Sequence, residues 1–227
     1  MNIVLLIVLA IIIINAYIGR RLGLVKILFS MLSMVIAIAL TMWISPKIDK
    51  VLLNNDKVYE KVINGVEKSF EEKDKNEAKD QDEYINKLPI PESLRKSIKE
   101  NELVEKQTEK ITNQFKQNVY GYMAKVVIKA IAFLITFMTV FIMLRVLSLA
   151  LNVISKLPII NALNQSGGLL VGLVQGVIIV WILFIVITAS SSTELGKMAL
   201  DSIKSSKILS FIYDTNFIFD IIISTMM

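Results

Sequence analysis

Residues 169–189 read LLVGLVQGVIIVWILFIVITA, a run of 21 residues without a charged side chain. A helix needs about 20 mostly apolar residues to cross the hydrocarbon core of a bilayer. Only Gln175 interrupts the apolar character of this run. The stretch therefore predicts a membrane-spanning helix, and it sets the standard by which the other apolar stretches are judged.

Three further stretches reach or approach this length, and they span residues 3–18, 22–44 and 126–147. Hydrophobic residues make up 54% of the chain, which is more than a water-facing surface tolerates. No basic residue precedes the first stretch and Arg20 and Arg21 follow it, which is the reverse of a signal peptide, so we expect it to be retained. These patterns predict an all-α integral membrane protein whose four transmembrane helices form two hairpins in contact with the lipid bilayer.

Charge is concentrated between the two predicted hairpins. Of the 45 charged residues, 31 lie between Lys47 and Lys116. Ser45 and Pro46 favour the start of a new helix, so we place the end of the second span there. The predicted regions are a first hairpin, a charged exterior insert of amphipathic helices, a second hairpin and an exterior or interfacial tail, at residues 1–45, 46–121, 122–190 and 191–227.

Within the insert, helical periodicity predicts one amphipathic helix that Asp56 caps and another that Pro91 opens, with a solvated spacer at 71–83 between them. The apolar faces of these helices either bind an exterior protein partner or pack on one another as a cap. In the tail, Asp214 and Asp220 are too costly for a fifth span. We expect a break near Asp214 and two short helices against the outer leaflet.

Two short loops carry basic residues and no acids. One is the turn Gly19-Arg20-Arg21-Leu22-Gly23, and the other runs from Arg145 to Ser166. Basic residues in short loops favour the cytoplasmic side of a membrane. We therefore expect both loops in the cytoplasm and both chain termini outside.

Gly168, Gly172 and Gly176 recur every four residues on one face of the fourth predicted span. Small residues allow helices to approach closely in lipid. This stripe predicts either packing against another helix of the same chain or self-association into a homo-oligomer. Gln175 beside the stripe must hydrogen-bond within the protein, and we expect it to join helices.

The sequence also excludes several kinds of chemistry. Because the chain has no cysteine and no histidine, it offers no thiolate nucleophile, no imidazole acid or base and no zinc site with those ligands. It has no phosphate-binding loop, nucleophile elbow or metal-ligand cluster. We therefore expect no enzyme activity, catalytic residue, cofactor or metal. The insert holds 15 basic and 16 acidic residues, so we expect no nucleic-acid binding.

The basic turn at 19–23, the segment LPIINALNQSGG at 157–168 and the segment SSKILSFI at 205–212 together resemble the colicin V production protein (CvpA) family. The resemblance covers roughly residues 1–46 and 120–215. It implies a bacterial inner-membrane protein that supports production or secretion of a peptide toxin, without catalytic residues. Gln175 and the pair Asn164-Gln165 depart from the family pattern. The alternatives are an oligomeric small-solute channel or permease, and a membrane scaffold for envelope homeostasis.

Overall fold

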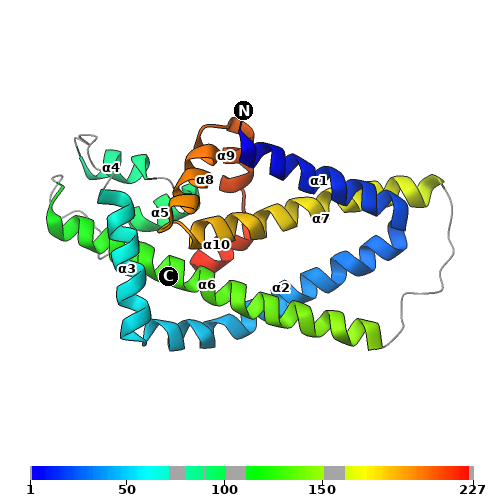
Figure 1. Ribbon diagram of the computed structural model, residues 1–227, viewed down its shortest axis with the longest axis horizontal. Coiled ribbons are helices and arrows are strands. Elements are labelled where there is room, and N and C mark those ends of the chain that lie inside the picture. Colours follow the sequence, from blue (N-terminus) through cyan, green and yellow to red (C-terminus); the bar gives the residue numbers. More distant parts are fainter. Residues whose placement is uncertain (1, 72–79, 89, 101–110, 151–161, 225–227) are drawn as a thin grey trace.

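The computed structural model describes residues 2–71, 80–88, 90–100, 111–150 and 162–224, and these ranges are helical throughout apart from short connections (Figure 1). In chain order the helices are α1 (Ile3–Leu22), α2 (Leu24–Leu53), α3 (Asp56–Glu71), α4 (Gln81–Lys87), α5 (Glu92–Glu100), α6 (Asn113–Ala150), α7 (Ala162–Ala189), α8 (Glu194–Lys204), α9 (Lys207–Asp214) and α10 (Phe217–Ser224). The prediction of an all-α fold is confirmed for these ranges.

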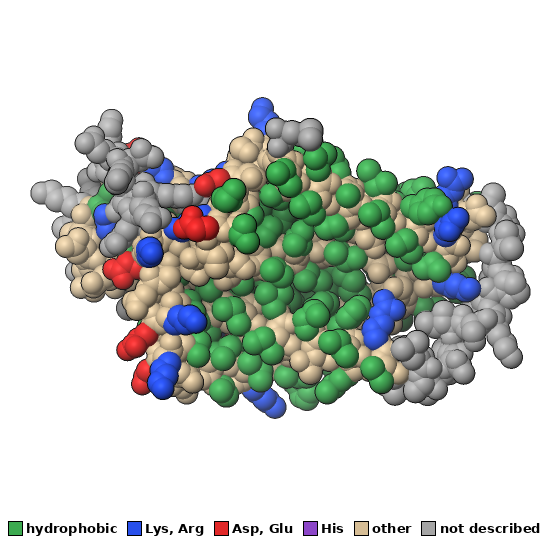
Figure 2. Space-filling view, viewed as in Figure 1, with side chains coloured by type: hydrophobic (Ala, Val, Ile, Leu, Met, Phe, Trp, Pro, Cys, Tyr) green, Lys and Arg blue, Asp and Glu red, His purple; other side chains and the backbone are tan. Residues whose placement is uncertain are grey.

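Four of the helices, α1, α2, α6 and α7, are long and apolar enough to cross a membrane. Large apolar side chains on their surfaces remain exposed, among them Ile13 on α1 and Trp43 on α2. Figure 2 shows these side chains as a broad apolar surface over the spans. Because such a surface is unfavourable in water, it identifies the lipid-facing side and confirms the four predicted spans.

The helices of each hairpin pack mainly against the other hairpin. α1 lies along α7, and α2 lies along α6, both in antiparallel orientation (Figure 1). The main core follows α6, with α2 and several other helices packed around it, and contains Phe133 and Phe137, whose rings stack with centroids 6.1 Å apart. The bundle therefore combines two pairs of helices that are distant in the sequence.

α2 does not end at Pro46. The helix continues to Leu53, and Figure 1 shows it changing direction in its C-terminal part. Proline removes one backbone N–H from the helical ladder and bends a helix, but a bent helix can continue when packing holds it. The predicted end of this helix at Ser45–Pro46 is therefore wrong, and eight more residues extend it.

Six short helices, α3, α4, α5, α8, α9 and α10, gather at one end of the spans, and we call them the cap (Figure 1). The apolar stripe of α3 points into the protein, with Val66 and Phe70 buried, and Leu94 and Ile98 of α5 are buried as well. These faces belong to the main core. The two predicted amphipathic helices therefore belong to the cap, but they pack mainly on other elements, α3 on α6 and α5 on α4 and α10, rather than on one another.

Two details of the insert differ from the prediction. Asn55 rather than Asp56 caps α3, because its Oδ1 accepts a hydrogen bond from the backbone N–H of Val58 at 3.3 Å. The end of the predicted spacer is helical, since α4 begins at Gln81 and Asp80 Oδ1 accepts the N–H of Glu83 at 2.7 Å. A short side chain with an acceptor oxygen is what a helix start favours.

The tail breaks where expected, because α9 ends at Asp214 and α10 begins at Phe217. However, α10 does not lie against a leaflet. Its Phe219 and Ile222 are buried, and it contacts α5, α6 and α7. Asp214 binds α5 and Asn216 binds α7, whereas the buried Oδ1 of Asp220 accepts no hydrogen bond within the described residues. The apolar side chains of α10 therefore hold this segment inside the protein.

Some predictions lie outside the described residues. They concern most of the spacer at 72–79, the segment 101–110 that precedes α6, and residues 151–161 of the second basic loop.

Candidate functional site

A charged pair, in which Asp49 is buried and Lys129 is partly buried, lies where α2, α6 and α10 meet. On α2, Thr41, Ser45 and Asp49 recur every four residues and are all buried, so they form one buried polar line along the helix. The bend after Ser45 does not interrupt this line. Lys129 on α6 faces it, and its charge interacts with the carboxylate of Asp49.

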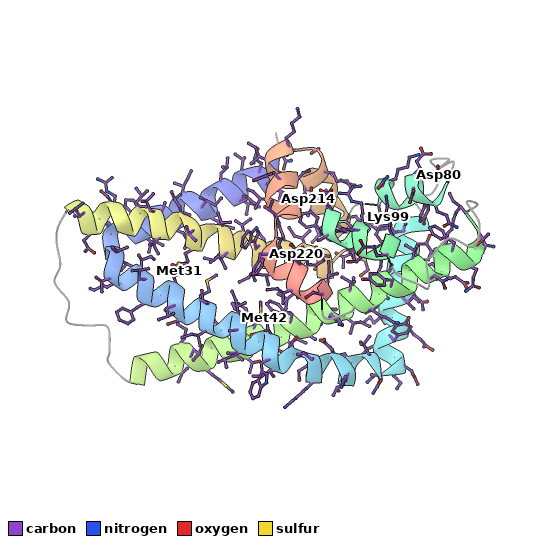
Figure 3. All side chains as sticks on the ribbon, turned by 180° about the vertical axis from the view of Figure 1, so that it is seen from behind. Met31, Met42, Asp80, Lys99, Asp214 and Asp220 are labelled. Atoms are coloured by element: carbon purple, nitrogen blue, oxygen red, sulfur yellow. The ribbon has the colours of Figure 1, made fainter. Side chains whose placement is uncertain are left out.

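Asp49 is 6% exposed, and its Oδ1 accepts no hydrogen bond within the described part of the chain. Its carboxylate and the Lys129 side chain line a cavity of about 20 Å³. The other lining residues are Met42, Ser45, Pro46, Phe133, Ile221 and Ile222. Figure 3 labels Met42 on α2 near the crossing with α6, which locates this cavity in the bundle.

A cavity of this size holds roughly one water molecule, since about 10 to 15 Å³ is the minimum that one requires. A water molecule there could donate to the orphan carboxylate oxygen. Buried ionisable residues in membrane helices commonly mark pathways for protons or ions. The arrangement can therefore hold a proton or a water molecule between two opposite charges.

The sequence interpretation missed this site because it ended the second span at Pro46. Asp49 then counted as part of the charged insert, and no acid remained within a span. The signal was present in the four-residue spacing of Thr41, Ser45 and Asp49.

The predicted glycine stripe lies against α1. A Cβ atom at Gly168 would collide with the backbone of Gly19 and Gly23, and one at Gly172 would collide with the backbone of Asn15 and Ala16. At Gly176, a Cβ atom would lie 3.0 Å from the Cα of Ile12. Close approach of this kind is why small residues stand at helix contacts in membranes.

Gln175 links a third helix to this region. It is buried, and its Nε2 donates a hydrogen bond to Ser30 Oγ of α2 at 3.3 Å, whereas its Oε1 has no partner within the described residues. Asn15 is satisfied within α1, since its Nδ2 donates to the carbonyl oxygen of Ile11 at 2.8 Å. Of these two polar groups, only Gln175 joins two spans.

The basic turn between α1 and α2 contacts the start of α7. Gly23 has φ of 78°, a conformation that favours glycine, and a side chain there would collide with Asn164. Asn164 Oδ1 accepts the backbone N–H of Val25 at 3.4 Å, in the first turn of α2. Asn164 therefore caps the start of α2 although it belongs to α7. An aspartate at this position could accept the same hydrogen bond.

The two arginines of the turn have different surroundings. Arg21 lies over the ring of Tyr17, with its guanidinium carbon 5.2 Å from the ring centroid. Arg20 is exposed and lines a surface cavity of about 480 Å³ together with Gln165, Ser166, Leu169 and Leu170. Arg20 and Arg21 therefore have different environments, although the sequence offers no reason to distinguish them.

The tail helices bind α7 through buried polar contacts. Asn216 is buried, and its Nδ2 donates to the carbonyl oxygen of Trp181 at 3.0 Å. The hydroxyls of Tyr213 and Thr188 share a hydrogen bond of 2.8 Å. Burial raises the pKa of Tyr213 far above its ordinary value, so its hydroxyl stays protonated.

The same tail binds the insert. Asp214 Oδ1 accepts the backbone N–H of Glu92, at the start of α5, at 3.0 Å, and lies 3.9 Å from Nη2 of Arg95. Figure 3 labels Asp214 at this junction. At the other edge of the tail, Asn2 donates to the carbonyl oxygen of Ser202 on α8. The tail therefore joins α1, α5 and α7.

Among the residues that the structure describes, no group of three or more acidic side chains could hold a metal ion.

Four apolar helices, a lipid-facing surface and a packed cap define a multi-pass helical membrane protein. Residues 105–216 match the family model described as Colicin V production protein, so this part of the chain is similar to the CvpA family. The match covers α6 to α9 and includes Lys129, whereas the first hairpin with Asp49 lies outside it. No curated protein and no solved structure matches the chain.

Proposed function

We propose that this chain is a non-enzymatic protein of the bacterial cytoplasmic membrane that supports production or secretion of a peptide toxin of the colicin V type. The family match over residues 105–216 carries this proposal, because it covers both spans of the second hairpin and the tail helices α8 and α9. The all-helical bundle with its polar cap is compatible with a role beside a secretion machine in the membrane.

Deletion and complementation in a toxin-producing strain test this role. Without the gene, we expect less toxin activity in the culture supernatant, and wild-type complementation should restore it. Toxin activity in cell lysates distinguishes the two steps, since a secretion defect raises it and a production defect lowers it. An unchanged titre in both fractions would contradict the proposal.

The proposed orientation places the basic turn in the cytoplasm, and the cap with both termini outside. It rests on Arg20, Arg21 and Lys26 and on the contact between Asn2 and Ser202, which puts the start of α1 beside the tail. Because the chain lacks cysteine, single cysteines at Lys57 and at Arg21 can be labelled selectively. A membrane-impermeant maleimide added to intact spheroplasts should label K57C and spare R21C. The reverse pattern would overturn the orientation.

A small-solute permease is the second candidate function, and the charged pair of Asp49 and Lys129 favours it. An oligomeric channel would need the glycine stripe as the contact between copies. That stripe is already covered by α1 of the same chain. Solute or proton flux in proteoliposomes tests the candidate, with D49N as the variant. Flux in the wild type that D49N abolishes would favour a permease over a role in toxin production.

A further inference from the structure

The surface cavity at the basic turn has the size and the lining of a site for a phospholipid headgroup. It measures about 480 Å³ and lies between the end of α1 and the start of α7, opposite the cap. Arg20 supplies a guanidinium, Gln165 an amide and Ser166 a hydroxyl. Leu169 and Leu170 supply an apolar wall.

The guanidinium of Arg20 is available for a ligand. It forms no ion pair, hydrogen bond or ring contact with the described part of the chain, whereas its neighbour Arg21 lies over Tyr17. A guanidinium presents several N–H donors in one plane and binds phosphate oxygens in pairs. Ser166 and Gln165 add donors on the same cavity wall.

The surroundings of the cavity indicate that its ligand comes from the bilayer. Leu170 is 62% exposed, Leu163 is 80% exposed and Ile18 is 42% exposed, so lipid-facing side chains flank the polar wall. Figure 2 shows Lys and Arg side chains, and no Asp or Glu, at this end of the face that it displays. A ligand here meets positive charge at one side and acyl chains at the other.

We propose that this cavity binds the phosphodiester headgroup of an anionic phospholipid, with Arg20 bound to the phosphate, Ser166 and Gln165 donating to headgroup oxygens, and Leu169 and Leu170 contacting the first acyl carbons. Basic pockets between membrane helices bind such headgroups. The site is independent of the proposed role in toxin production. A bound lipid would also cover the contact between α1 and α7 at its cytoplasmic end.

The test uses the full chain purified in detergent and equilibrated with equal amounts of phosphatidylglycerol and phosphatidylethanolamine, with bound lipid measured by native mass spectrometry. We expect the wild type to retain phosphatidylglycerol preferentially. R20Q should reduce its retention about fivefold, the effect of one basic side chain at an anionic headgroup. R21Q is the matched control, since it removes the adjacent charge outside the cavity, and it should retain lipid like the wild type.

Gln165→Glu provides a second variant that does not remove the arginine. Its carboxylate would pair with Arg20 and occupy the place of the phosphate, so retention should fall as in R20Q while the melting temperature stays unchanged. Equal losses in R20Q and R21Q, or no loss in R20Q, would overturn the proposal. Inorganic phosphate is the competitor: thermal stabilisation by phosphate that requires Arg20, without any preference for phosphatidylglycerol, would assign the site to a free anion and overturn the lipid assignment.

Discussion

The two long helix pairs of this bundle pack through residues of opposite size. Between α1 and α7, glycines bring the two backbones into contact, whereas α2 and α6 enclose a layer of large side chains that includes Phe133 and Phe137. Lipid provides little hydrophobic force between helices, so close van der Waals contact must hold both pairs. The comparison shows that the packing of α1 on α7 depends on glycines, which have no Cβ atom. The packing of α2 on α6 depends on the shapes of large side chains and on the charged pair of Asp49 and Lys129.

The largest effect is expected from adding a side chain to the glycine contact. Gly172→Leu should lower the free energy of unfolding by about 3 kcal/mol, because the backbone of Asn15 and Ala16 leaves no space for it. The melting temperature in detergent measures this loss. Val174→Leu is the control, since Val174 is 50% exposed on the same helix and should tolerate the change. Equal melting temperatures for the two variants would show that the glycines do not hold α1 and α7 together.

The second pair is sensitive to charge. Asp49→Asn should cost about 2 kcal/mol, because it leaves the Lys129 ammonium without its counter-charge in a partly buried site. Thermal unfolding of D49N, K129M and the double variant gives a double-mutant cycle. We expect the double variant to be more stable than the sum of the single losses predicts. Strict additivity would mean that the two residues act independently.

A third effect depends on pH and tests the contact between the cap and α7. Burial raises the pKa of Tyr213 far above the ordinary tyrosine value near 10, so above that pH the unfolded chain loses this proton while the folded chain keeps it. Stability therefore falls as pH rises, by about 1.4 kcal/mol per pH unit above pH 10. Chemical denaturation between pH 8 and pH 11 should show a steeper decline for the wild type than for Tyr213→Phe. Parallel declines would refute the role of this hydroxyl.

The smallest effect concerns the turn at the opposite end. Asn164→Leu removes the oxygen that accepts the N–H of Val25 and should cost about 1 kcal/mol. Asn164→Asp keeps an acceptor and adds a favourable charge at the start of α2, so its melting temperature should equal or exceed that of the wild type. A wild-type melting temperature for N164L would show that the hydrogen bond from Val25 to Asn164 does not stabilise the start of α2.

Apolar length and charge were enough to predict the four spans, the break after Asp214 and the cap of insert helices. They failed at Pro46, because a proline marks a helix start and a bend equally well, and only packing against α6 decides between the two. They failed for α10 because Asp220 suggested solvent or an interface, whereas the helices that bury its apolar side chains are not visible in one sequence. Arg20 and Arg21 could not be distinguished, since their difference arises from which helix each faces.

The contact of Gly19 with Gly168 also has a consequence for how the protein is made. The two residues lie about 150 positions apart, so α1 enters the membrane long before α7 has been synthesised. During that interval the face of α1 that contains Ile12, Ala16 and Gly19 has no partner in its own chain, and the nascent first hairpin must persist alone or beside an insertion factor. Contacts between such distant segments form late. Assembly of this bundle is therefore completed only after translation has passed the fourth span.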